Sequence, residues 1–139
     1  MCEELHNSIY PYLWQQLKDN HTLPLKLTDA TLNIEPRGYL LFDVRIEVPG
    51  EKFSIAGWRV VRANGLVIIE NAWVRDTFRQ SGLGKFFAAF RVAAFNQMRE
   101  SECENIEQIC YVNPTNEVQI HILKAVGWER VSNKLWRVK

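Results

Sequence analysis

The segment that most constrains this chain joins an apolar run to a long helical pattern through two closely spaced glycines. The apolar run ends at Val74, and the helical pattern begins at Leu83. Between them, Arg79-x-x-Gly82-x-Gly84 places both glycines where a strand becomes a helix. Glycine lets the backbone approach a ligand closely, and the first amides of a helix lack partners within it. The junction therefore predicts an anion site, for which a phosphate-bearing cofactor is the natural ligand.

Two well-known phosphate loops do not fit this segment. The pattern Gly-x-Gly-x-x-Gly lacks its third glycine because Phe87 stands there. The pattern Gly-x-x-x-x-Gly-Lys-Ser/Thr fails because Phe86 occupies its hydroxyl position. Taken alone, Gly-x-Gly is more often an ordinary tight turn than a phosphate loop. The sequence thus favours neither a dinucleotide-binding fold nor an NTPase.

The segment does resemble the acyl-coenzyme A loop of the GNAT superfamily of N-acetyltransferases. That loop has the pattern Val-x-x-x-x-Arg/Gln-x-x-Gly-x-Gly/Ala, and it is matched at every spacing by Val74, Arg79, Gly82 and Gly84. A proline and a further glycine that are frequent in the loop are absent here. The match is therefore strong in spacing and incomplete in composition.

A second match follows downstream, between Asn116 and Trp128. It resembles the family segment in which an asparagine precedes Tyr-x-x-x-Gly-Phe, with Gly127 in place and Trp128 as the aromatic residue. Leu123 stands where the tyrosine is expected. The two matches together cover roughly residues 66 to 138, about half of the chain.

The resemblance implies an α+β fold with a mixed, mainly antiparallel central sheet, covered by helices on both faces. Two splayed central strands would admit the pantetheine arm of acetyl-CoA, and backbone amides would hold its pyrophosphate. The cofactor-binding residues so implied are Trp73, Val74, Arg79, Gln80, Ser81, Gly82, Leu83, Gly84, Lys85 and Asn116. Trp73 and Val74 would contact pantetheine through their backbone, and their side chains are expected to belong to the core.

Glu70 and Tyr111 are the candidate catalytic residues. Acetyl transfer needs a neutral amine, a polarised carbonyl and a proton for the departing thiolate. Glu70 is expected to share a strand face with Val74 unless a bulge intervenes. It is either the base, directly or through water, or a solvated or ion-paired carboxylate. Tyr111 precedes Asn116 by five residues. Its hydroxyl either contacts the substrate or donates a proton, or the side chain packs in the core. Leu123 cannot donate a proton, so the tyrosine acid of the family is missing from its usual place.

Composition fits a single packed domain spanning residues 1–139. The chain is 47% hydrophobic and has a formal net charge of +1, which gives no reason to expect nucleic acid or an anionic membrane as a partner. The most apolar stretch, Phe86 to Phe95, is short and interrupted by Arg91, which argues against a membrane span. We expect a small molecule or another protein surface as the partner.

The cysteines and histidines indicate no metal site. Three cysteines form no metal-like pair and are typical of a reduced, cytoplasmic protein. Cys110 is expected in the core, and His121 is expected on the surface. Trp58 lies on an expected strand and is a candidate for the wall of the acceptor pocket. No signal or transit peptide is expected.

Hydrophobic periodicity predicts the elements that carry these residues. The N-terminal helix should break, or restart, at Pro11. A later helix should be capped by Asn113, with Pro114 at its first position, and should end at Gly127. The expected strands are an irregular edge strand within residues 25–34, then 39–48, 52–63, 66–74 and 106–112, with a terminal hairpin of 128–131 and 134–138; a buried helix follows Gly82.

The interpretation that accounts for most of these features is an acetyl-CoA-dependent N-acetyltransferase that acts on a primary amine by direct transfer. The acceptor stays open between a small amine, a peptide N-terminus and a protein lysine. One alternative is a GNAT-shaped coenzyme A-binding or interaction protein without turnover, and a weaker one is an anion-binding regulatory domain. Members of the family often form dimers, so a homodimer is open as well.

Overall fold

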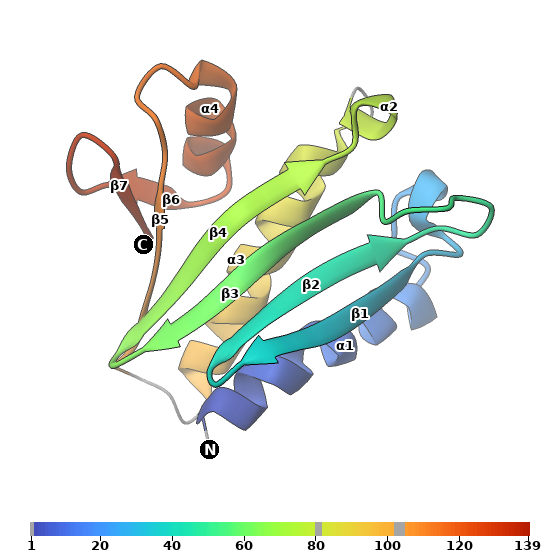
Figure 1. Cartoon of the computed structure of the whole chain (residues 1–139), viewed down its shortest axis with the longest axis horizontal. Helices are drawn as coiled ribbons and strands as arrows, with labels where there is room; N and C mark the ends of the chain where they lie inside the picture. The colour runs from blue at the N-terminus through green and yellow to red at the C-terminus, as the bar shows by residue number, and fades with distance from the viewer. Residues whose placement is uncertain (1, 80–81, 102–104) are drawn as a thin grey trace.

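The computed structural model describes residues 2–79, 82–101 and 105–139, with side chains from residue 8 onward. Its elements are α1 (Cys2–Asp19), the 3-10 helix η1 (Leu25–Leu27), β1 (Thr31–Gly38), β2 (Leu41–Glu47), β3 (Ala56–Ala63), β4 (Leu66–Val74), α2 (Asp76–Arg79), α3 (Leu83–Glu100), β5 (Glu107–Tyr111), α4 (Glu117–Ala125), β6 (Trp128–Arg130) and β7 (Leu135–Val138). The strands form one sheet in the order β1-β2-β3-β4-β5-β7-β6 (Figure 1). This arrangement confirms the predicted α+β class.

Antiparallel pairing dominates the sheet. Strands β1 to β4 form a meander, and β5, β7 and β6 pair antiparallel at the other end. The β3–β4 hairpin turns at Asn64 and Gly65, as predicted, and Gly65 has a φ of 69°. Strands β4 and β5 form a parallel pair, and a parallel pair needs a crossover, which α3 supplies. The loop and helix identified in the sequence therefore lie at the centre of the sheet.

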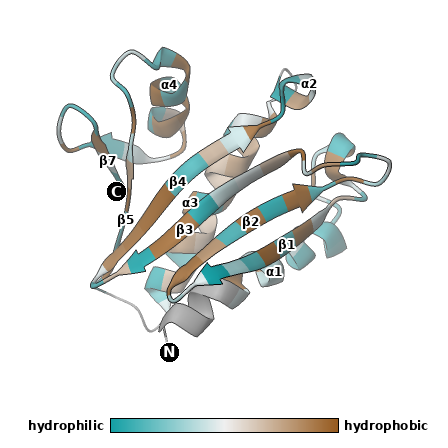
Figure 2. Cartoon of the chain, viewed as in Figure 1, coloured by the Kyte–Doolittle hydropathy of each residue, from teal (hydrophilic) through white to brown (hydrophobic). Residues whose placement is uncertain are grey.

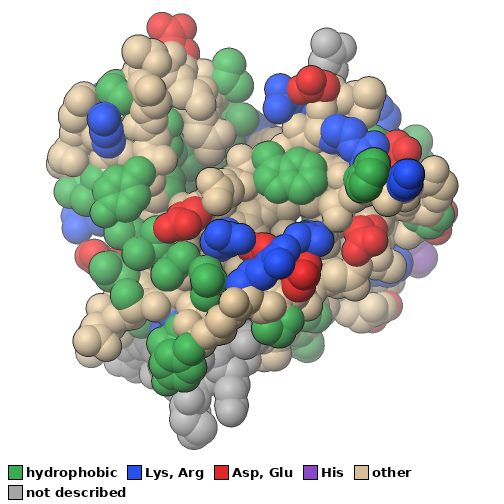
Figure 3. All heavy atoms as spheres, viewed as in Figure 1, with side chains coloured by type: hydrophobic (Ala, Val, Ile, Leu, Met, Phe, Trp, Pro, Cys, Tyr) green, Lys and Arg blue, Asp and Glu red, His purple; other side chains and the backbone are tan. Residues whose placement is uncertain are grey.

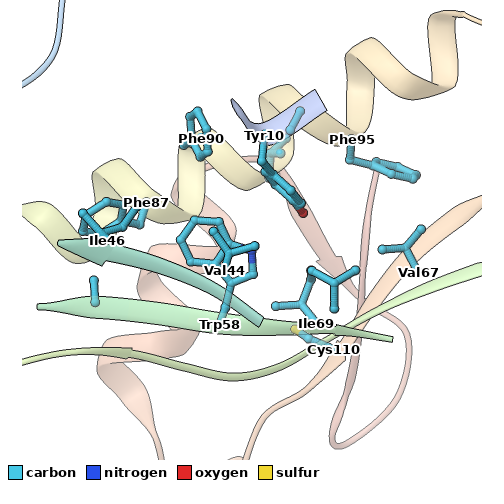
Figure 4. Packing of buried hydrophobic residues seen from close by; sticks show 14 of the residues in the cluster. Tyr10, Val44, Ile46, Trp58, Val67, Ile69, Phe87, Phe90, Phe95 and Cys110 are labelled. Atoms are coloured by element: carbon cyan, nitrogen blue, oxygen red, sulfur yellow. The ribbon is translucent and has the colours of Figure 1, made fainter. Parts of the chain in front are cut away.

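Helices α1 and α3 cover one face of the meander (Figure 1). Strand β2 alternates, turning Phe42, Val44 and Ile46 into the core, and Figure 2 shows this alternation as brown and teal bands. In Figure 4, Trp58 of β3 rises from the sheet toward Tyr10 of α1, with ring centroids 5.6 Å apart. Burying an aromatic side chain of this kind contributes about 1.5–3 kcal/mol. Packing of this aromatic layer fixes α3, and hence its N-terminus, against the sheet.

The opposite face of the meander carries ion pairs, and Figure 3 shows blue and red side chains gathered across its middle. Asp43 accepts from Arg59 Nε at 2.9 Å and from Arg37 Nε at 2.8 Å. The hydrogen bond from Arg59 is the main reason that the pKa of Asp43 lies below its usual value. Next to this group, Arg45 pairs with Glu35 at 2.9 Å. On strands β1 to β4, helical cover is therefore confined to the other face.

Several sequence-based boundaries need correction. Helix α1 runs unbroken through Pro11, because the proline removes a single amide donor while Tyr10 and Trp14 on either side are anchored in the core. The edge strand β1 begins only at Thr31, and part of the expected stretch forms η1. Strand β3 begins at Ala56, later than predicted. The predicted β4 and terminal hairpin are confirmed.

The cap of α4 is Asn116, and the prediction of Asn113 is wrong. Asn116 Oδ1 accepts from the amide of Gln119 at 3.1 Å, which fixes the first turn of α4. Asn113 Oδ1 instead accepts from the amide of Thr115 at 3.0 Å and forms a turn before the helix. At the other end, Gly127 follows the last helical turn with a φ of 103°, as predicted. The described helices include none with the length and apolarity to span a bilayer.

Candidate functional site

The central strands part after a short stretch of pairing. Strand β4 pairs with β5 through three residues of each strand, ending at Ile68 opposite Ile109. Beyond this point β5 stays with β7, where Tyr111 pairs with Leu135, while β4 stays with β3 as far as Val74. The β4 edge from Ile69 onward therefore faces a gap in the sheet. This confirms the predicted splay.

A bulge in β4 changes the prediction for Glu70. Arg59 of β3 pairs with Glu70 and Gly57 with Trp73, so two residues of β4 oppose Trp58 alone. The first of them, Asn71, has a φ of 50°, in the left-handed region. The side chain of Trp58 faces the helices, so its neighbours Gly57 and Arg59 face the other side of the sheet, here called the open face. Trp73 pairs with Gly57 and Glu70 pairs with Arg59, so both lie on the open face as well. Glu70 does not share a face with Val74, contrary to the expectation for an unbulged strand.

Trp73 and Val74 also differ in burial. Val74 packs against the core, as predicted. Trp73 is 43% exposed, and its prediction as a core side chain is wrong. Its indole covers Gly57, where an added Cβ would lie 3.1 Å from Trp73 Nε1. The glycine thus makes room for an aromatic ring on the open face of the sheet.

The backbone of Val74 is turned toward the gap. The amide of Arg75 donates to the Ile55 carbonyl at 2.7 Å, on the β3 side. Because successive residues of a strand direct their backbone groups to alternate sides, the amide and carbonyl of Val74 point away from β3. Arg79 Nε donates to the Val74 carbonyl at 2.7 Å. This bond ties the loop to the end of β4 and leaves the Val74 amide with no acceptor among the described residues.

The N-terminus of α3 opens beside that strand end. Gly82 precedes the helix with a φ of 74° and a ψ of 10°, and no side chain caps it. An added Cβ at Gly82 would meet nothing within 4 Å. Within the described ranges, no acceptor is found for the amides of Leu83, Gly84 and Lys85. These three amides are the described part of the predicted donor set; Gln80 and Ser81 lie outside the described residues.

Two cavities occupy the gap and share part of their lining. A cavity of about 510 Å³ runs along Trp73 and Val74 to Arg79 and Gly84. A second cavity, of about 450 Å³, is lined by Glu70 and Tyr111, among others. The four residues that line both cavities are Ala72, Arg91, Asn116 and Gln119. Volumes of this size are typical of small-molecule sites.

The predicted site residues are therefore largely brought together. Asn116 uses Oδ1 as a helix cap, so its side-chain amide nitrogen remains for the cavity that it lines. Tyr111 is 66% exposed, which excludes the core-packing interpretation. Lys85 is exposed beside the helix start, whereas the side chain of Leu83 is buried. Among the described members of the set, Leu83 contributes only its backbone.

Arg91 is a charged cavity residue that the sequence prediction did not include. The sequence showed it only as an interruption of an apolar stretch. In the structure it lies on α3, is 6% exposed and lines both cavities. A charged residue in the middle of an otherwise apolar helical face was the available signal.

The remaining candidates take structural places. Cys110 is in the core, as predicted, and it also lines the second cavity. Burial raises the pKa of its thiol to about 12. Trp58 is buried in the aromatic layer, and His121 is exposed, as predicted. Across the described part of the chain, no cluster of His, Cys, Asp and Glu has the composition of a metal site.

Comparisons with known proteins give no match to a family model and no match to a curated protein. Solved structures do match. A protein of Klebsiella pneumoniae subsp. pneumoniae MGH 78578, provisionally described as an acyl-CoA N-acyltransferase, is 14% identical with a TM-score of 0.55; the match covers 94% of this chain and 86% of that one. The ribosomal-protein-S18-alanine N-acetyltransferase of Escherichia coli is 10% identical with a TM-score of 0.58, covering 73% and 70%.

A GNAT family acetyltransferase of Elizabethkingia anophelis, solved with acetyl-CoA bound, is also similar to this chain. It is 10% identical with a TM-score of 0.56, and the match covers 75% of this chain and 78% of that one. At such identities the likeness concerns the fold. Together with the splayed β4 and β5 and the glycine junction before α3, it shows that this chain has the GNAT fold.

Proposed function

We propose that this protein, as one domain of residues 1–139, is an acetyl-CoA-dependent N-acetyltransferase that transfers the acetyl group directly to a primary amine. The observation that carries the proposal is the unpaired edge of β4 beyond Ile68, which opens beside the uncapped N-terminus of α3. A chain-like ligand with an anionic end fits both features at once. The amides of the helix suit its phosphates, and the strand edge suits its amide-bearing arm.

The described residues fit the coenzyme A moiety. The amides of Leu83, Gly84 and Lys85 have no acceptor among the described residues, and the space above Gly82 is open, so a diphosphate can approach the backbone there. Gln80 and Ser81 complete this loop in the proposal. The backbone of Trp73 and Val74 would hold the pantetheine arm, and Asn116 would donate to it from the far wall.

Bound acetyl-CoA would supply the thioester whose acetyl group is transferred. The Val74 amide, directed into the gap, would donate to the carbonyl oxygen and stabilise negative charge there. Glu70 would take a proton from the amine, directly or through water, and Tyr111 would donate one to the leaving sulfur. Both side chains line the same cavity. Positioning in the gap would supply much of the rate through effective molarity.

Direct transfer is supported by the state of Cys110. A covalent route through this residue would require its thiolate, because the thiolate is the nucleophile. Burial raises the pKa of the Cys110 thiol to about 12, so the thiol stays neutral at pH 7. In this proposal Cys110 therefore lines the cavity and is not a nucleophile. The cytoplasmic location expected from the cysteines stays a prediction.

Calorimetric titration with acetyl-CoA tests the binding step, and thiol release over a panel of primary amines tests turnover. We expect the wild type to bind acetyl-CoA saturably and to release thiol. Gly82→Trp should lose both binding and thiol release, because its side chain would occupy the diphosphate site. Gly50→Trp is the matched control, because Gly50 also has a positive φ, of 89°, and open space around it, but lies in a distant turn. The proposal would be refuted if about millimolar acetyl-CoA, a concentration far above ordinary cofactor dissociation constants, gave neither heat of binding nor thermal stabilisation.

A second candidate function is coenzyme A binding without turnover. The observation that favours it is Leu123, which is buried at the cavity wall where the family has its tyrosine acid. This candidate predicts normal acetyl-CoA binding and no thiol release with any amine. Turnover that Gly82→Trp abolishes while the fold is retained would exclude it.

A further inference from the structure

Arg91 is placed where the two cavities meet. It lies on α3, is 6% exposed, and lines both the cavity beside Gly84 and the cavity beside Tyr111. It is eight residues beyond Leu83, which corresponds to about 12 Å along the helix axis. Arg91 therefore lies about two helical turns from the amides that suit a diphosphate, at the junction of the two cavities.

Among the described residues, no carboxylate acts on the charge of Arg91: Glu70 lines the second cavity with it, but Glu70 is not among the groups that affect the pKa of Arg91. Its guanidinium lies over the ring of Trp58, 5.0 Å from the centroid. The titratable groups near it in the described chain are Tyr10 and Cys110, and the pKa of each is raised to about 12 by burial, so both are neutral at pH 7. Burial lowers the pKa of Arg91 to about 10, so it stays cationic. A buried cation without an anion is costly, and a ring face offsets only part of that cost.

We propose that Arg91 binds a carboxylate of the substrate where the two cavities meet. The inference rests on the proposed function and names its substrate class. The carboxylate can come from either of two substrates. It is the free end of a dicarboxylic acyl chain on coenzyme A, or it is the carboxylate of an amino-acid acceptor. In both cases the ligand neutralises a charge that the free protein leaves buried.

The chemistry of arginine suits this role. A guanidinium presents paired N–H donors that match the two oxygens of a carboxylate, and such charge-assisted bonds are stronger than neutral ones. A substrate without the carboxylate leaves the cation uncompensated. Hydrogen bonds to charged groups correspond to a preference of about tenfold to a hundredfold for the carboxylate-bearing substrate.

Calorimetry and thiol release with paired substrates test the proposal. Succinyl-CoA is compared with acetyl-CoA, and β-alanine as acceptor is compared with propylamine, in the wild type and in Arg91→Met. If the acyl chain carries the carboxylate, succinyl-CoA binds at least about tenfold more tightly than acetyl-CoA. If the acceptor carries it, the preference shows instead in kcat/KM for β-alanine. Arg91→Met removes either preference, while the matched control Arg99→Met, on the same helix but bonded to Asn96 and Lys139, keeps it.

Thermal unfolding without ligand separates this role from a structural one. Arg91→Met removes an uncompensated charge from an apolar layer, so its melting temperature should equal or exceed that of the wild type. A lower melting temperature together with an unchanged substrate preference assigns Arg91 to packing and overturns the inference. Equal binding of both acyl-CoA esters and equal use of both acceptors overturns it while leaving the proposed function intact. Binding of neither ester overturns both.

Discussion

The two glycines of the Arg79-x-x-Gly82-x-Gly84 junction should respond to alanine with opposite signs. In the sequence they belong to one motif, but their conformations differ. Gly82 has a φ of 74°, in the left-handed region, whereas Gly84 lies within the first turn of α3. Gly82→Ala should therefore destabilise the protein, and Gly84→Ala should stabilise it.

The magnitude at Gly82 is set by backbone strain, since an added Cβ there meets nothing within 4 Å. Holding a residue other than glycine in the left-handed region costs about 1–2 kcal/mol. For a chain of 139 residues, the entropy of unfolding is about 0.29 kcal/mol per kelvin, so 1 kcal/mol shifts the melting temperature by roughly 3 °C. We expect Gly82→Ala to lower the melting temperature by about 3–7 °C.

The magnitude at Gly84 follows from helix propensity. An added Cβ would lie 3.8 Å from Ile122 Cδ1 of α4, an ordinary van der Waals contact. Alanine is favoured over glycine within helices by about 0.5–1 kcal/mol, so Gly84→Ala should raise the melting temperature by about 2–3 °C. The contact with Ile122 would add apolar packing between α3 and α4.

Differential scanning calorimetry of the two variants beside the wild type measures both shifts. Urea unfolding at one temperature provides an independent free energy and shows whether the slope with denaturant stays constant. Shifts of the same sign, or a Gly82→Ala melting temperature equal to that of the wild type, would refute the assignment of a left-handed residue directly before α3.

Three further predictions concern individual side chains. Glu70→Gln and Tyr111→Phe should each lower kcat, and Glu70→Gln should lower it by about a hundredfold or more. The affinity for acetyl-CoA, measured by calorimetry, should change little. Unimpaired turnover in both variants contradicts the assigned roles. Cys110 should resist iodoacetamide at pH 8 in the native state and react on unfolding, as followed by mass spectrometry, because burial raises its pKa to about 12; rapid native labelling contradicts this. Asp43, whose pKa is lowered in the fold, stabilises above its unfolded pKa of 3.8 and loses this effect as pH falls through its folded pKa. The stability difference between the wild type and Asp43→Asn should therefore be constant near pH 7 and shrink toward pH 3; a pH-independent difference contradicts the Arg59 and Arg37 pairing.

Local patterns predicted the parts of the site that depend on local backbone chemistry. The glycine junction, strand β4 and the buried face of α3 all follow from turn chemistry and periodicity within short windows. The parting of β4 and β5 was expected only from the resemblance, because pairing between strands distant in sequence leaves no local signature. The same limit applies to the choice between Asn113 and Asn116 as the helix cap, since either side chain can accept a hydrogen bond from a backbone amide a few residues further along the chain.

The corrected residues depend on tertiary context. The bulge at Asn71 turns Glu70 onto the open face. Asparagine tolerates the left-handed region, but a single asparagine within a strand pattern does not by itself predict a bulge. Trp73 is exposed because Gly57 on the neighbouring strand leaves room for its ring. Arg91 belongs to the site because α3 packs with that side chain over Trp58 and into the gap. Each of these features arises from a neighbour brought close by folding.

A crystal structure of the protein with acetyl-CoA is the most direct test of the central claim. We expect the diphosphate on the amides of Leu83, Gly84 and Lys85 and the pantetheine arm between β4 and β5. The thioester carbonyl should lie within hydrogen-bond distance of the Val74 amide. A diphosphate bound elsewhere, or an arm that runs outside the gap between β4 and β5, would contradict the account.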